Sequence, residues 1–409
     1  MRILMVSDVY FPRINGVSTS IQTFRRGLRS LGHETVLIAP EYPASQAAVA
    51  DEGEIIRIPS RYLPRDPEDR LMKAGDIRRL TAALGQRNFD IVHVQTPFVA
   101  HYQGVRLARS MGVPVVESYH TYFEEYLHHY VPLLPRALMR LLARRFTTSQ
   151  CNALDALVVP SRAMQAALAE YGVRCPMQII PTGMEMERFA GGDGVHFRER
   201  LGIPADRPTL VHVGRVAHEK NIDFLFRVLR RVVERRPDVT LIVAGEGPAL
   251  AHCKSYVESL GLSANVKFVG YLSRDSALLD CYKAGDLFVF ASKTETQGLV
   301  LLEAMALGVP VVSTAYMGTA DIVTPQRGAR MAPDDEQGFA DIVVGLLADP
   351  QQRAAMAVAA REYAATWSAA AMAAKLIDFY RHVITASANS PSPVRGKRQG
   401  MGAASEGKG

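Results

Sequence analysis

The fold class is decided by three consecutive segments, TLVHVG (209–214), NIDFLFRVLRRVVERRP (221–237) and VTLIVAG (239–245). The first and the last are short, rich in Val, and apolar at successive positions, which is typical of strands buried on both faces of a parallel sheet. The middle segment repeats its apolar residues with the period of a helix. A strand, a helix and a second strand in this order predict a βαβ unit.

The same alternation fills the rest of the chain and predicts two domains of this kind. Further apolar runs occur at 2–7, 34–40, 90–95, 113–119 and 156–161, and then at 266–271, 286–292 and 309–314. Amphipathic stretches separate them, for example TSIQTFRRGLRSLGH at 19–33. We therefore predict an α/β protein with two Rossmann-like, doubly wound domains that face each other across a cleft.

The domain boundary is expected near IIPTGMEMERF (179–189), where a strand-like segment is followed by the turn residues GGDG. The first domain then covers 1–180 and the second 181–366. A helical stretch at 361–384 has no strand after it, and its part from 367 to 386 is expected to pack back on the first domain. Residues 387–409 are rich in Ser, Pro, Gly and basic residues, which predicts a disordered tail.

Composition excludes several classes of protein. Of the 409 residues, 48% are hydrophobic, which excludes global disorder, and the net charge of +6 is too small to indicate nucleic-acid binding. The four cysteines form no CxxC pair and have no zinc-site spacing. MRILMVSDVYFP at the start is typical of a first strand and not of a signal peptide, and no run is long enough to span a membrane. We expect a cytoplasmic protein that lies, if anywhere, on the inner face of the plasma membrane.

Polar residues follow the predicted strands, where a doubly wound domain binds its ligand. In DVYFPRINGVSTS (8–20), Asn15 and Gly16 predict a tight turn, with Ser18 or Thr19 capping the next helix. Such a turn can bind an anion at the helix start, and it can equally be an ordinary turn between a strand and a helix. In VHVGRVAHEKN (211–221), Arg215 and Lys220 precede a helix whose dipole disfavours cations, so they indicate a diphosphate site rather than two solvated charges.

A third loop, SKTETQGLVLLEAMALG (292–308), carries Glu295 and Glu303 eight positions apart, with Gly298 between them. Glu295 is expected on the loop before a helix and Glu303 about one turn inside it. Acidic residues favour a helix start for electrostatic reasons alone. Glu303, however, has apolar neighbours, so it needs a partner if it is buried, and a pair of ribose hydroxyls would be one.

His120, in ESYHTYFEEYLHHY (117–130), follows a predicted strand and could face the cleft. A single histidine at such a place is also often structural. The stretch lacks the pairing of His with Glu that zinc peptidases have, and we predict no metal site.

Five of these motifs occur together in an order that resembles glycosyltransferase family four, of the GT-B fold. They are the glycine loop at 15–17, YHT at 119–121, GRVAHEKN at 214–221, AGEGP at 244–248 and the E-x7-E pair. The resemblance covers residues 1 to about 385. Within the family, NGVSTS, YHTYFEEYLHHYVP and TETQGLVLLEA are most similar to bacterial diacylglycerol glucosyltransferases and related glycolipid mannosyltransferases.

The resemblance implies a nucleotide-sugar donor, UDP- or GDP-linked, with no cofactor and no metal, and a reaction that retains anomeric configuration. It assigns the donor diphosphate to Arg215, Lys220 and Gly16, and the ribose to Glu303. The other assignments are Glu295 and His120 as catalytic residues beside the sugar, Gln297, Gly298 and Leu299 as its backbone contacts, and Tyr271 beside the base.

Transfer of glucose from UDP-glucose to a lipid such as diacylglycerol is the function that the resemblance favours, because Gln297 stands where many relatives have Phe. In MGTADIV (317–323), Asp321 stands where relatives often have Glu, so the sugar stays open. The alternatives are a GDP-mannose-dependent mannosyltransferase, a family-four transferase with a soluble or polysaccharide acceptor, another GT-B enzyme such as an epimerase or a phosphorylase, and a non-catalytic sugar-nucleotide-binding protein. A phosphorylase would need a pyridoxal lysine site, which we do not identify.

VPLLPRALMRLLARRFTTS (131–149) carries four arginines and no acidic residue. Arg136, Arg140 and Arg144 are four apart and share one helical face, whereas Leu134, Leu138, Leu141 and Leu142 line another. A helix of this kind lies on an anionic membrane surface. An ordinary surface helix, with its leucines packed on the domain core, is the alternative.

Overall fold

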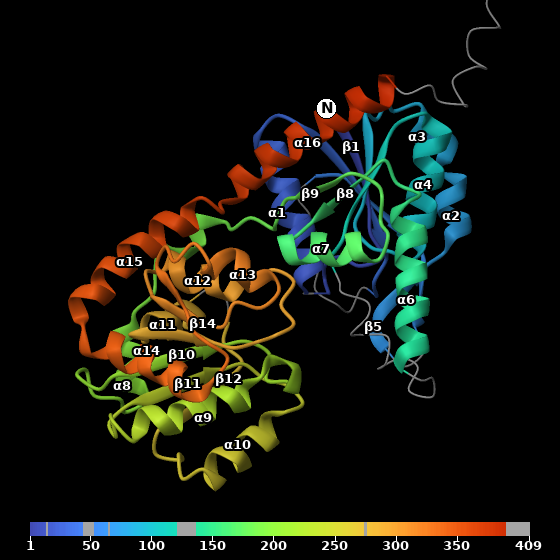
Figure 1. Cartoon of the computed structure of the whole chain (residues 1–409). Helices are drawn as coiled ribbons and strands as arrows, with labels where there is room; N and C mark the ends of the chain where they lie inside the picture. The colour runs from blue at the N-terminus through green and yellow to red at the C-terminus, as the bar shows by residue number, and fades with distance from the viewer. Residues whose placement is uncertain (14, 44–52, 64–65, 121–135, 274–275, 390–409) are drawn as a thin grey trace, which may run out of the picture. The chain divides into compact units, whose positions relative to one another are not determined.

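The computed structural model describes residues 1–13, 15–43, 53–63, 66–120, 136–273 and 276–389. These residues form two compact units (Figure 1). The first unit contains Met1–Val159, Gln165–Ile180 and the chain from Met372 onward, and the second contains Pro160–Met164 and Pro181–Ala371.

The sheet of the first unit has seven parallel strands, and one of its inner strands, β1 (Arg2–Val6), is fully buried from Ile3 to Val6. Strand order is β3-β2-β1-β6-β7-β8-β9. The strands are added outward from β1 in both directions, first β2 and β3 on one side and then β6 to β9 on the other. This order is the topology of a doubly wound fold. The other strands are β2 (Glu34–Pro40), β3 (Ile55–Ile58), β6 (Ile91–Val94), β7 (Val115–Ser118), β8 (Ala156–Val159) and β9 (Met177–Ile179), and β4 (Ser60–Leu63) pairs with β5 (Asp66–Met72) as an antiparallel hairpin.

Helices cover both faces of this sheet, as β6 shows. Val92 and Val94 lie against Gly104 of α4 (Val99–Met111), whereas His93, between them, contacts Tyr380 of α16 (Ala369–Asn389). Because neighbouring side chains of a strand point to opposite faces, α4 and α16 lie on opposite sides of the sheet. The other helices here are α1 (Gly16–Ser30), α2 (Ala74–Arg79), α3 (Thr81–Gly85), α6 (Arg136–Cys151) and α7 (Arg162–Glu170).

The second unit repeats this architecture around a sheet of six parallel strands in the order β12-β11-β10-β13-β14-β15. Side chains alternate between two hydrophobic clusters, so that Leu241 and Val243 of β11 belong to one and Ile242 to the other. The strands are β10 (Thr209–Val213), β11 (Thr240–Ala244), β12 (Val266–Gly270), β13 (Leu287–Phe290), β14 (Val311–Ser313) and β15 (Ala329–Met331). The helices are η1 (Met186–Phe189), α8 (Gly194–Arg200), η2 (His218–Lys220), α9 (Ile222–Val233), α10 (Leu250–Ser259), α11 (Ala277–Lys283), α12 (Leu299–Ala306), α13 (Gly318–Val323), α14 (Glu336–Ala348) and α15 (Pro350–Ala365).

The helical stretch predicted at 361–384 is wrong as a single helix. It is two helices, α15 and α16, separated at 366–368. There the carbonyl of Trp367 accepts from the Met184 N–H at 2.8 Å, and the Ala369 N–H donates to the Met184 carbonyl at 2.8 Å. These bonds take up backbone groups that a continuous helix would use internally. From Met372 onward α16 belongs to the first unit, and residues 390–409 of the predicted tail lie outside the described residues.

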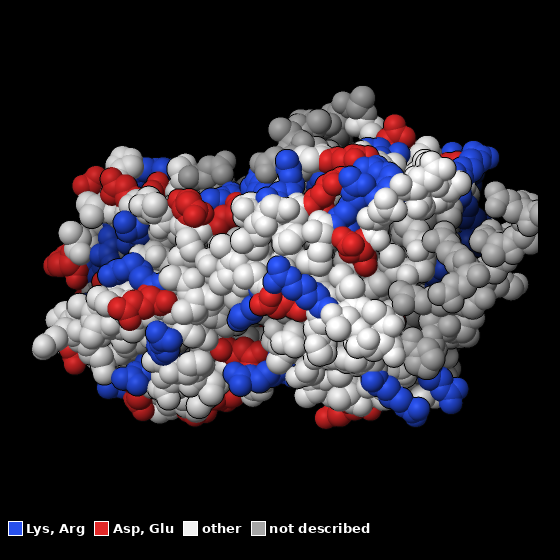
Figure 2. Space-filling view, turned by 90° about the horizontal axis from the view of Figure 1, so that it is seen from above, with Lys and Arg blue, Asp and Glu red and all other residues white. Residues whose placement is uncertain are grey.

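The prediction of an α/β protein with two doubly wound sheets is confirmed, and each apolar run quoted above forms a strand. Strands β3, β4, β5 and β15, which are edge or hairpin strands, were not predicted from the sequence. Acidic and basic side chains are interspersed over the face in Figure 2, with no large field of one sign there. None of the described helices has the length and apolar character needed to cross a membrane.

Candidate active site

Two predicted site residues of the second unit meet at the carboxyl ends of neighbouring strands. Strands β10 and β13 are paired, and Lys220 and Glu295 follow them. The Lys220 Nζ lies 2.6 Å from Glu295 Oε1, and about a fifth of each side chain is exposed (20% and 19%). Lys220 is therefore not a solvated charge but one half of a shielded ion pair.

Arg215 occupies the same loop in a different environment. Its side chain is 62% exposed, and its guanidinium lies 3.5 Å from Glu219 in a solvent-accessible pair. Such a pair contributes little to stability, so the guanidinium can turn to another anion at small cost. The loop itself is held in place because the Asn221 side chain donates to the Ala291 carbonyl at 3.1 Å.

The start of α12 is shaped by Gln297 and Gly298. Gly298 has φ +91°, and a Cβ there would lie 2.9 Å from Thr319 Cγ2, so only glycine fits. The Gln297 side chain, 7% exposed, accepts from the Thr182 N–H at 2.9 Å and donates to the Thr182 carbonyl at 2.8 Å. Since that amide is committed to the backbone, a ligand here would meet the backbone N–H groups at the helix start, which reaches Leu299.

Glu303 lies inside α12, as expected, and it has a partner in the protein that the sequence did not indicate. The hydroxyl of Tyr282, a side chain with 0% exposure on α11, donates to Glu303 Oε2 at 2.7 Å. In the described part of the chain no donor reaches the other oxygen, Oε1. The contact fixes the carboxylate and leaves one oxygen able to accept from a ligand. No pattern in the sequence links positions 282 and 303, because they meet only through the packing of α11 on α12.

Backbone bonds join the loops after β10, β11 and β12. The Gly214 N–H donates to the Ala244 carbonyl at 3.0 Å, and the Gly245 N–H donates to the Gly270 carbonyl at 2.8 Å. A Cβ on Gly245 would lie 1.9 Å from the Gly214 oxygen, which explains the glycine in AGEGP. Tyr271 follows directly and is 68% exposed, so its backbone is presented at the same edge of the sheet.

In the first unit, Gly16 is the first residue of α1 and faces open space, since a Cβ there would meet nothing within 4 Å. The cap predicted for Ser18 or Thr19 is wrong. Asn15 is the cap, and its side chain accepts from the Ser18 N–H at 2.8 Å. The helix begins earlier than the polar run suggested, and Asn15 stands just before it.

His120 follows β7 and lies 3.2 Å from Gln95, between His120 Nε2 and Gln95 Oε1. Burial lowers the pKa of His120 to about 4. Its neighbour His93 is held by the Ser118 hydroxyl at 2.9 Å and by Tyr380, and burial lowers its pKa to about 3. Both rings are therefore neutral near pH 7, and His120 can exchange hydrogen bonds with a ligand without adding a charge.

Asp8, at the end of β1, is a candidate that the sequence analysis missed. Its carboxylate accepts from the Thr96 hydroxyl at 2.8 Å and from the Ala100 N–H at 3.1 Å, and burial raises its pKa to about 7. These bonds fix the segment that carries Gln95, the partner of His120. An Asp directly after a fully buried strand was the available signal.

Residues 121–135 of the histidine-rich stretch, with His128 and His129, lie outside the described residues. Among the described residues, no group of three or more His, Cys, Asp or Glu side chains is arranged to hold a metal ion. The four cysteines are free thiols, three of them buried. The absence of a metal requirement stays a prediction.

Two Rossmann-like units, each with polar loops at the carboxyl ends of its strands, define the GT-B class of nucleotide-sugar-dependent enzymes. Residues 14–188 match the family described as "Glycosyltransferase Family 4", and residues 196–363 match "Glycosyl transferases group 1". The chain is 32% identical over 320 residues to an alpha-monoglucosyldiacylglycerol synthase of Streptococcus pneumoniae, which covers 76% of this chain and 71% of that protein. This chain belongs to glycosyltransferase family four.

The chain is also similar to a mannosyltransferase and to two solved structures. A GDP-mannose-dependent alpha-mannosyltransferase of Mycobacterium tuberculosis is 28% identical over 360 residues, which covers 87% of this chain and 90% of that protein. The fold is that of sucrose-phosphate synthase from Thermosynechococcus elongatus, with a TM-score of 0.73, 21% identity, and coverage of 94% of this chain and 99% of that one. It is equally that of Anabaena HepE, solved in complex with UDP, with a TM-score of 0.72, 18% identity, and coverage of 93% and 100%.

Proposed function

We propose that this glycosyltransferase moves a hexose from a nucleotide-sugar, with UDP-glucose as the first candidate, to a membrane lipid such as diacylglycerol, with retention of configuration. The observation that carries the proposal is the shielded Lys220–Glu295 pair, 2.6 Å apart, beside the start of α12. The name of the Streptococcus relative supports the lipid acceptor and the glucosyl group.

The ion pair suits a donor because each of its two residues can bind a different part of a nucleotide-sugar. The diphosphate offers Lys220 a second anion, and Arg215 is free to reach the same group. Glu295 can then accept hydrogen bonds from sugar hydroxyls, together with the N–H groups at Gly298 and Leu299. Glu303, held by Tyr282 through one oxygen, binds the ribose through the other.

The proposed reaction forms a bond between the acceptor oxygen and the anomeric carbon and breaks the bond from that carbon to the diphosphate. The acceptor proton passes to the leaving phosphate on the same face of the sugar. Negative charge grows on the diphosphate during this step, and fixed cations aimed at growing charge are an effective form of catalysis. Arg215 and Lys220 supply these cations, and we infer that no metal and no cofactor is required.

Gly16 and His120 belong to the first unit, and their roles stay predictions. Open space in front of Gly16 suits a donor phosphate near the start of α1. A neutral His120 suits a contact with the sugar near the reacting carbon, where a hydrogen bond without a charge is needed. Substituting Gly16 with Val and His120 with Ala, with donor affinity and turnover measured separately, tests the two roles independently.

The test of the proposed function is a donor panel followed by a transfer assay. Thermal shift with UDP-glucose, UDP-galactose, UDP-N-acetylglucosamine and GDP-mannose identifies the donor, since a ligand bound only to the folded state raises the melting temperature. The donor is then incubated with diacylglycerol in vesicles, with a soluble glycan, or with no acceptor. We expect UDP-glucose to stabilise the protein and a glucolipid to form. If a donor binds but its sugar is neither transferred nor hydrolysed, the protein is a non-catalytic sugar-nucleotide-binding protein and the proposal is wrong.

A GDP-mannose donor is the second candidate, because the Mycobacterium relative of that name is similar over 87% of this chain. The sequence around Asp321 leaves the sugar open. In the structure Asp321 lies on α13, and its carboxylate accepts a hydrogen bond from Arg162 Nε at 2.9 Å, so its side chain makes a contact within the protein. Stabilisation by GDP-mannose and not by any UDP-sugar would select the second candidate.

We also infer that α6 contacts an anionic membrane surface, on the cytoplasmic side of the plasma membrane. Leu141 and Leu142 are 47% and 46% exposed, whereas the helix turns Ala143 and Thr147 to the core. About half of each of these leucines is therefore open to solvent. Arg145 is exposed beside them, and Arg144 stacks on the Tyr171 ring at 4.7 Å.

The membrane contact is tested by vesicle co-sedimentation. Residues 131–135 and the side chains as far as Arg140 lie outside the described residues, so the test uses Leu141, Leu142 and Arg145. Replacing both leucines with Ser and Arg145 with Glu should reduce sedimentation with anionic vesicles and leave donor binding intact. Equal sedimentation of this variant and the wild type would contradict the membrane contact and favour a soluble acceptor.

A further inference from the structure

The contact between Gln95 and His120 determines which ring nitrogen of His120 carries a hydrogen. His120 Nε2 lies 3.2 Å from Gln95 Oε1. An amide oxygen can only accept a hydrogen bond, so the hydrogen is on His120 Nε2. Because burial lowers the pKa of His120 to about 4, the ring is neutral near pH 7 and carries one hydrogen in all. His120 Nδ1 therefore has no hydrogen and can only accept.

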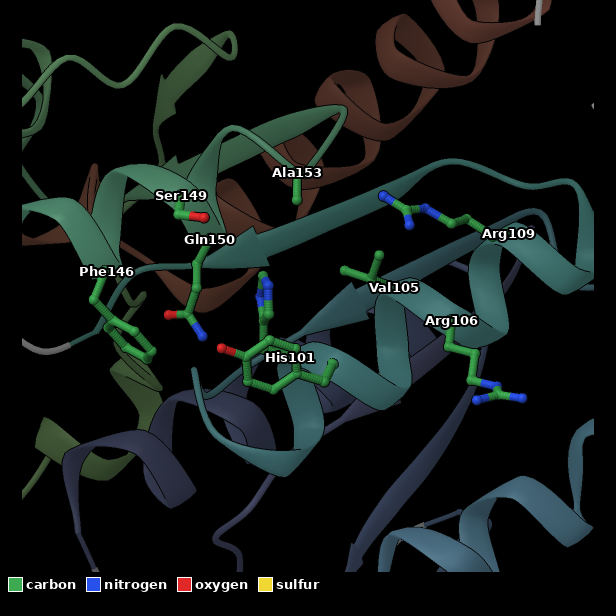
Figure 3. Close-up of a pocket in the computed structure, with 9 residues that line it drawn as sticks. His101, Val105, Arg106, Arg109, Phe146, Ser149, Gln150 and Ala153 are labelled. Carbon is green, nitrogen blue, oxygen red and sulfur yellow. The ribbon is translucent and has the colours of Figure 1, made fainter. Parts of the chain in front are cut away.

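Gln95 can hold the ring because the segment after β6 is itself fixed on two sides. The Gln95 N–H donates to the Val6 carbonyl of β1 at 2.9 Å. On the other side, the Gln150 amide of α6 donates to the Pro97 carbonyl at 2.6 Å. Figure 3 shows Gln150 in the wall of a cavity of about 340 Å³ between α4 and α6. Since Gln95 is also only 2% exposed, its amide has little room to turn away from His120.

The other polar side chains of β7 are bound elsewhere and do not reach His120 Nδ1. The Glu117 carboxylate lies 2.6 Å from His101 Nδ1 on α4, and the Ser118 hydroxyl lies 2.9 Å from His93 Nε2. Burial lowers the pKa of His93 to about 3, so this second ring beside His120 is neutral as well. Within the described part of the chain, His120 Nδ1 makes no hydrogen bond. Its lone pair is therefore available to a ligand.

We propose that Gln95 is a positioning residue that holds His120 as the Nε2–H tautomer, so that His120 Nδ1 accepts a hydrogen bond from a hydroxyl of the transferred sugar. A hydroxyl has a hydrogen to donate, whereas the oxygens of an ionised phosphate can only accept. The tautomer therefore directs His120 to the sugar and away from the diphosphate. The assignment of the hydroxyl to a donor sugar rests on the proposed function, and the tautomer does not.

The tautomer is measured by NMR on the full chain at pH 7 without any ligand. Ring nitrogen-15 shifts separate a protonated nitrogen from an unprotonated one, and the His120 signals are those that disappear in His120→Ala. We expect a hydrogen on Nε2 alone in the wild type, and averaged shifts from two tautomers in Gln95→Met. Gln165→Met is the control, because it removes an amide that donates to the Met177 carbonyl, and it should keep the wild-type signals. A hydrogen on Nδ1 in the wild type, or unchanged shifts in Gln95→Met, would overturn the proposal.

The direction of the hydrogen bond is tested with UDP-glucose analogues in which fluorine replaces the hydroxyl at C2, C3, C4 or C6, because fluorine cannot donate. Calorimetric binding is compared between the wild type and His120→Ala, with analogues of GDP-mannose instead if the donor panel selects that sugar.

We expect one analogue to bind the wild type about 10-fold more weakly than the unmodified donor, and this difference to fall below about 3-fold in His120→Ala. The nucleoside diphosphate, which lacks the sugar, should bind both proteins alike. Equal fluorine effects in the two proteins for all four analogues would overturn the sugar contact. If no nucleotide-sugar binds at all, the proposed function fails and the sugar contact with it, whereas the tautomer is decided by the NMR result alone.

Discussion

Replacing Tyr282 with Phe removes one hydroxyl and tests whether the orientation of Glu303 matters for the donor. The hydroxyl donates to Glu303 Oε2 at 2.7 Å from a side chain with 0% exposure. A hydrogen bond to a charged group contributes about 1.5–3 kcal/mol, and Phe keeps the ring that fills the core. The variant should fold, with a melting temperature lowered by several degrees.

Donor affinity is the informative quantity. Without Tyr282 the Glu303 carboxylate is free to leave the position from which Oε1 meets the ribose. If half of that lost bond energy, about 0.75–1.5 kcal/mol, appears in donor binding, the dissociation constant rises about 4- to 12-fold. Turnover at saturating donor should change by no more than about 3-fold, since the ribose does not react.

Calorimetric donor binding, steady-state kinetics and thermal melting together check this prediction. Tyr256→Phe on α10 is the control, because it also removes a tyrosine hydroxyl from the second unit, away from α12. The control should keep its donor affinity. A Tyr282→Phe enzyme that loses stability but binds the donor like the wild type would refute the positioning role.

Other predictions address the ion pair, the metal, the C-terminal helix and a buried histidine. Glu303→Ala and Lys220→Ala should each reduce kcat/KM about 100-fold or more, roughly 3 kcal/mol, with circular dichroism unchanged, and a near-normal kcat/KM would remove the assignment. Activity should persist in EDTA, and loss restored by magnesium or manganese would contradict this. A chain ending at Ala388 should melt like the wild type, whereas one ending at Trp367 lacks the buried side chains of α16 and should unfold or lose activity; full activity in the shorter chain would be the contrary result. Burial lowers the pKa of His212 to about 4, so the unfolded state binds more protons between about pH 6.5 and pH 4, and stability is lost as pH falls through this window by at most ~1.4 kcal/mol per pH unit. Urea unfolding of His212→Leu should show a shallower loss over that range, and equal slopes would count against a neutral buried His212.

The sheets were predictable because their strands are buried on both faces. RILMVS and TLVHVG are apolar at successive positions, so periodicity alone places them at the centre of parallel sheets. Strand β3 was not predicted because Arg57 interrupts its apolar run and most of its side chains are half-buried. The break between α15 and α16 was not predicted for a different reason. Its cause is Met184, which is far away in the sequence and whose backbone forms hydrogen bonds on both sides of the break.

The candidate site was predictable residue by residue but not in its contacts. The loop lengths place Lys220 and Glu295 after paired strands, yet their ion pair depends on side-chain directions that a sequence does not contain. Tyr282 had no signal, since a tyrosine on an amphipathic helix is usually a core residue. Gln297 stands where many relatives have Phe, and its side chain is hydrogen-bonded to the Thr182 backbone. Its role in sugar selection would then act through the backbone at the start of α12.

The central proposal is retaining transfer of a hexose to a lipid, and the anomeric configuration of the first product tests it most directly. The full chain is incubated with UDP-glucose, an α-linked donor, and diacylglycerol in anionic vesicles, in EDTA. The lipid fraction is then analysed by mass spectrometry and by proton NMR of the anomeric signal. We predict one added hexose with the α configuration, and much less of this product from Glu303→Ala under the same conditions. A β-linked glucolipid would contradict retention, and glucose released or transferred only to a soluble acceptor would contradict the lipid acceptor.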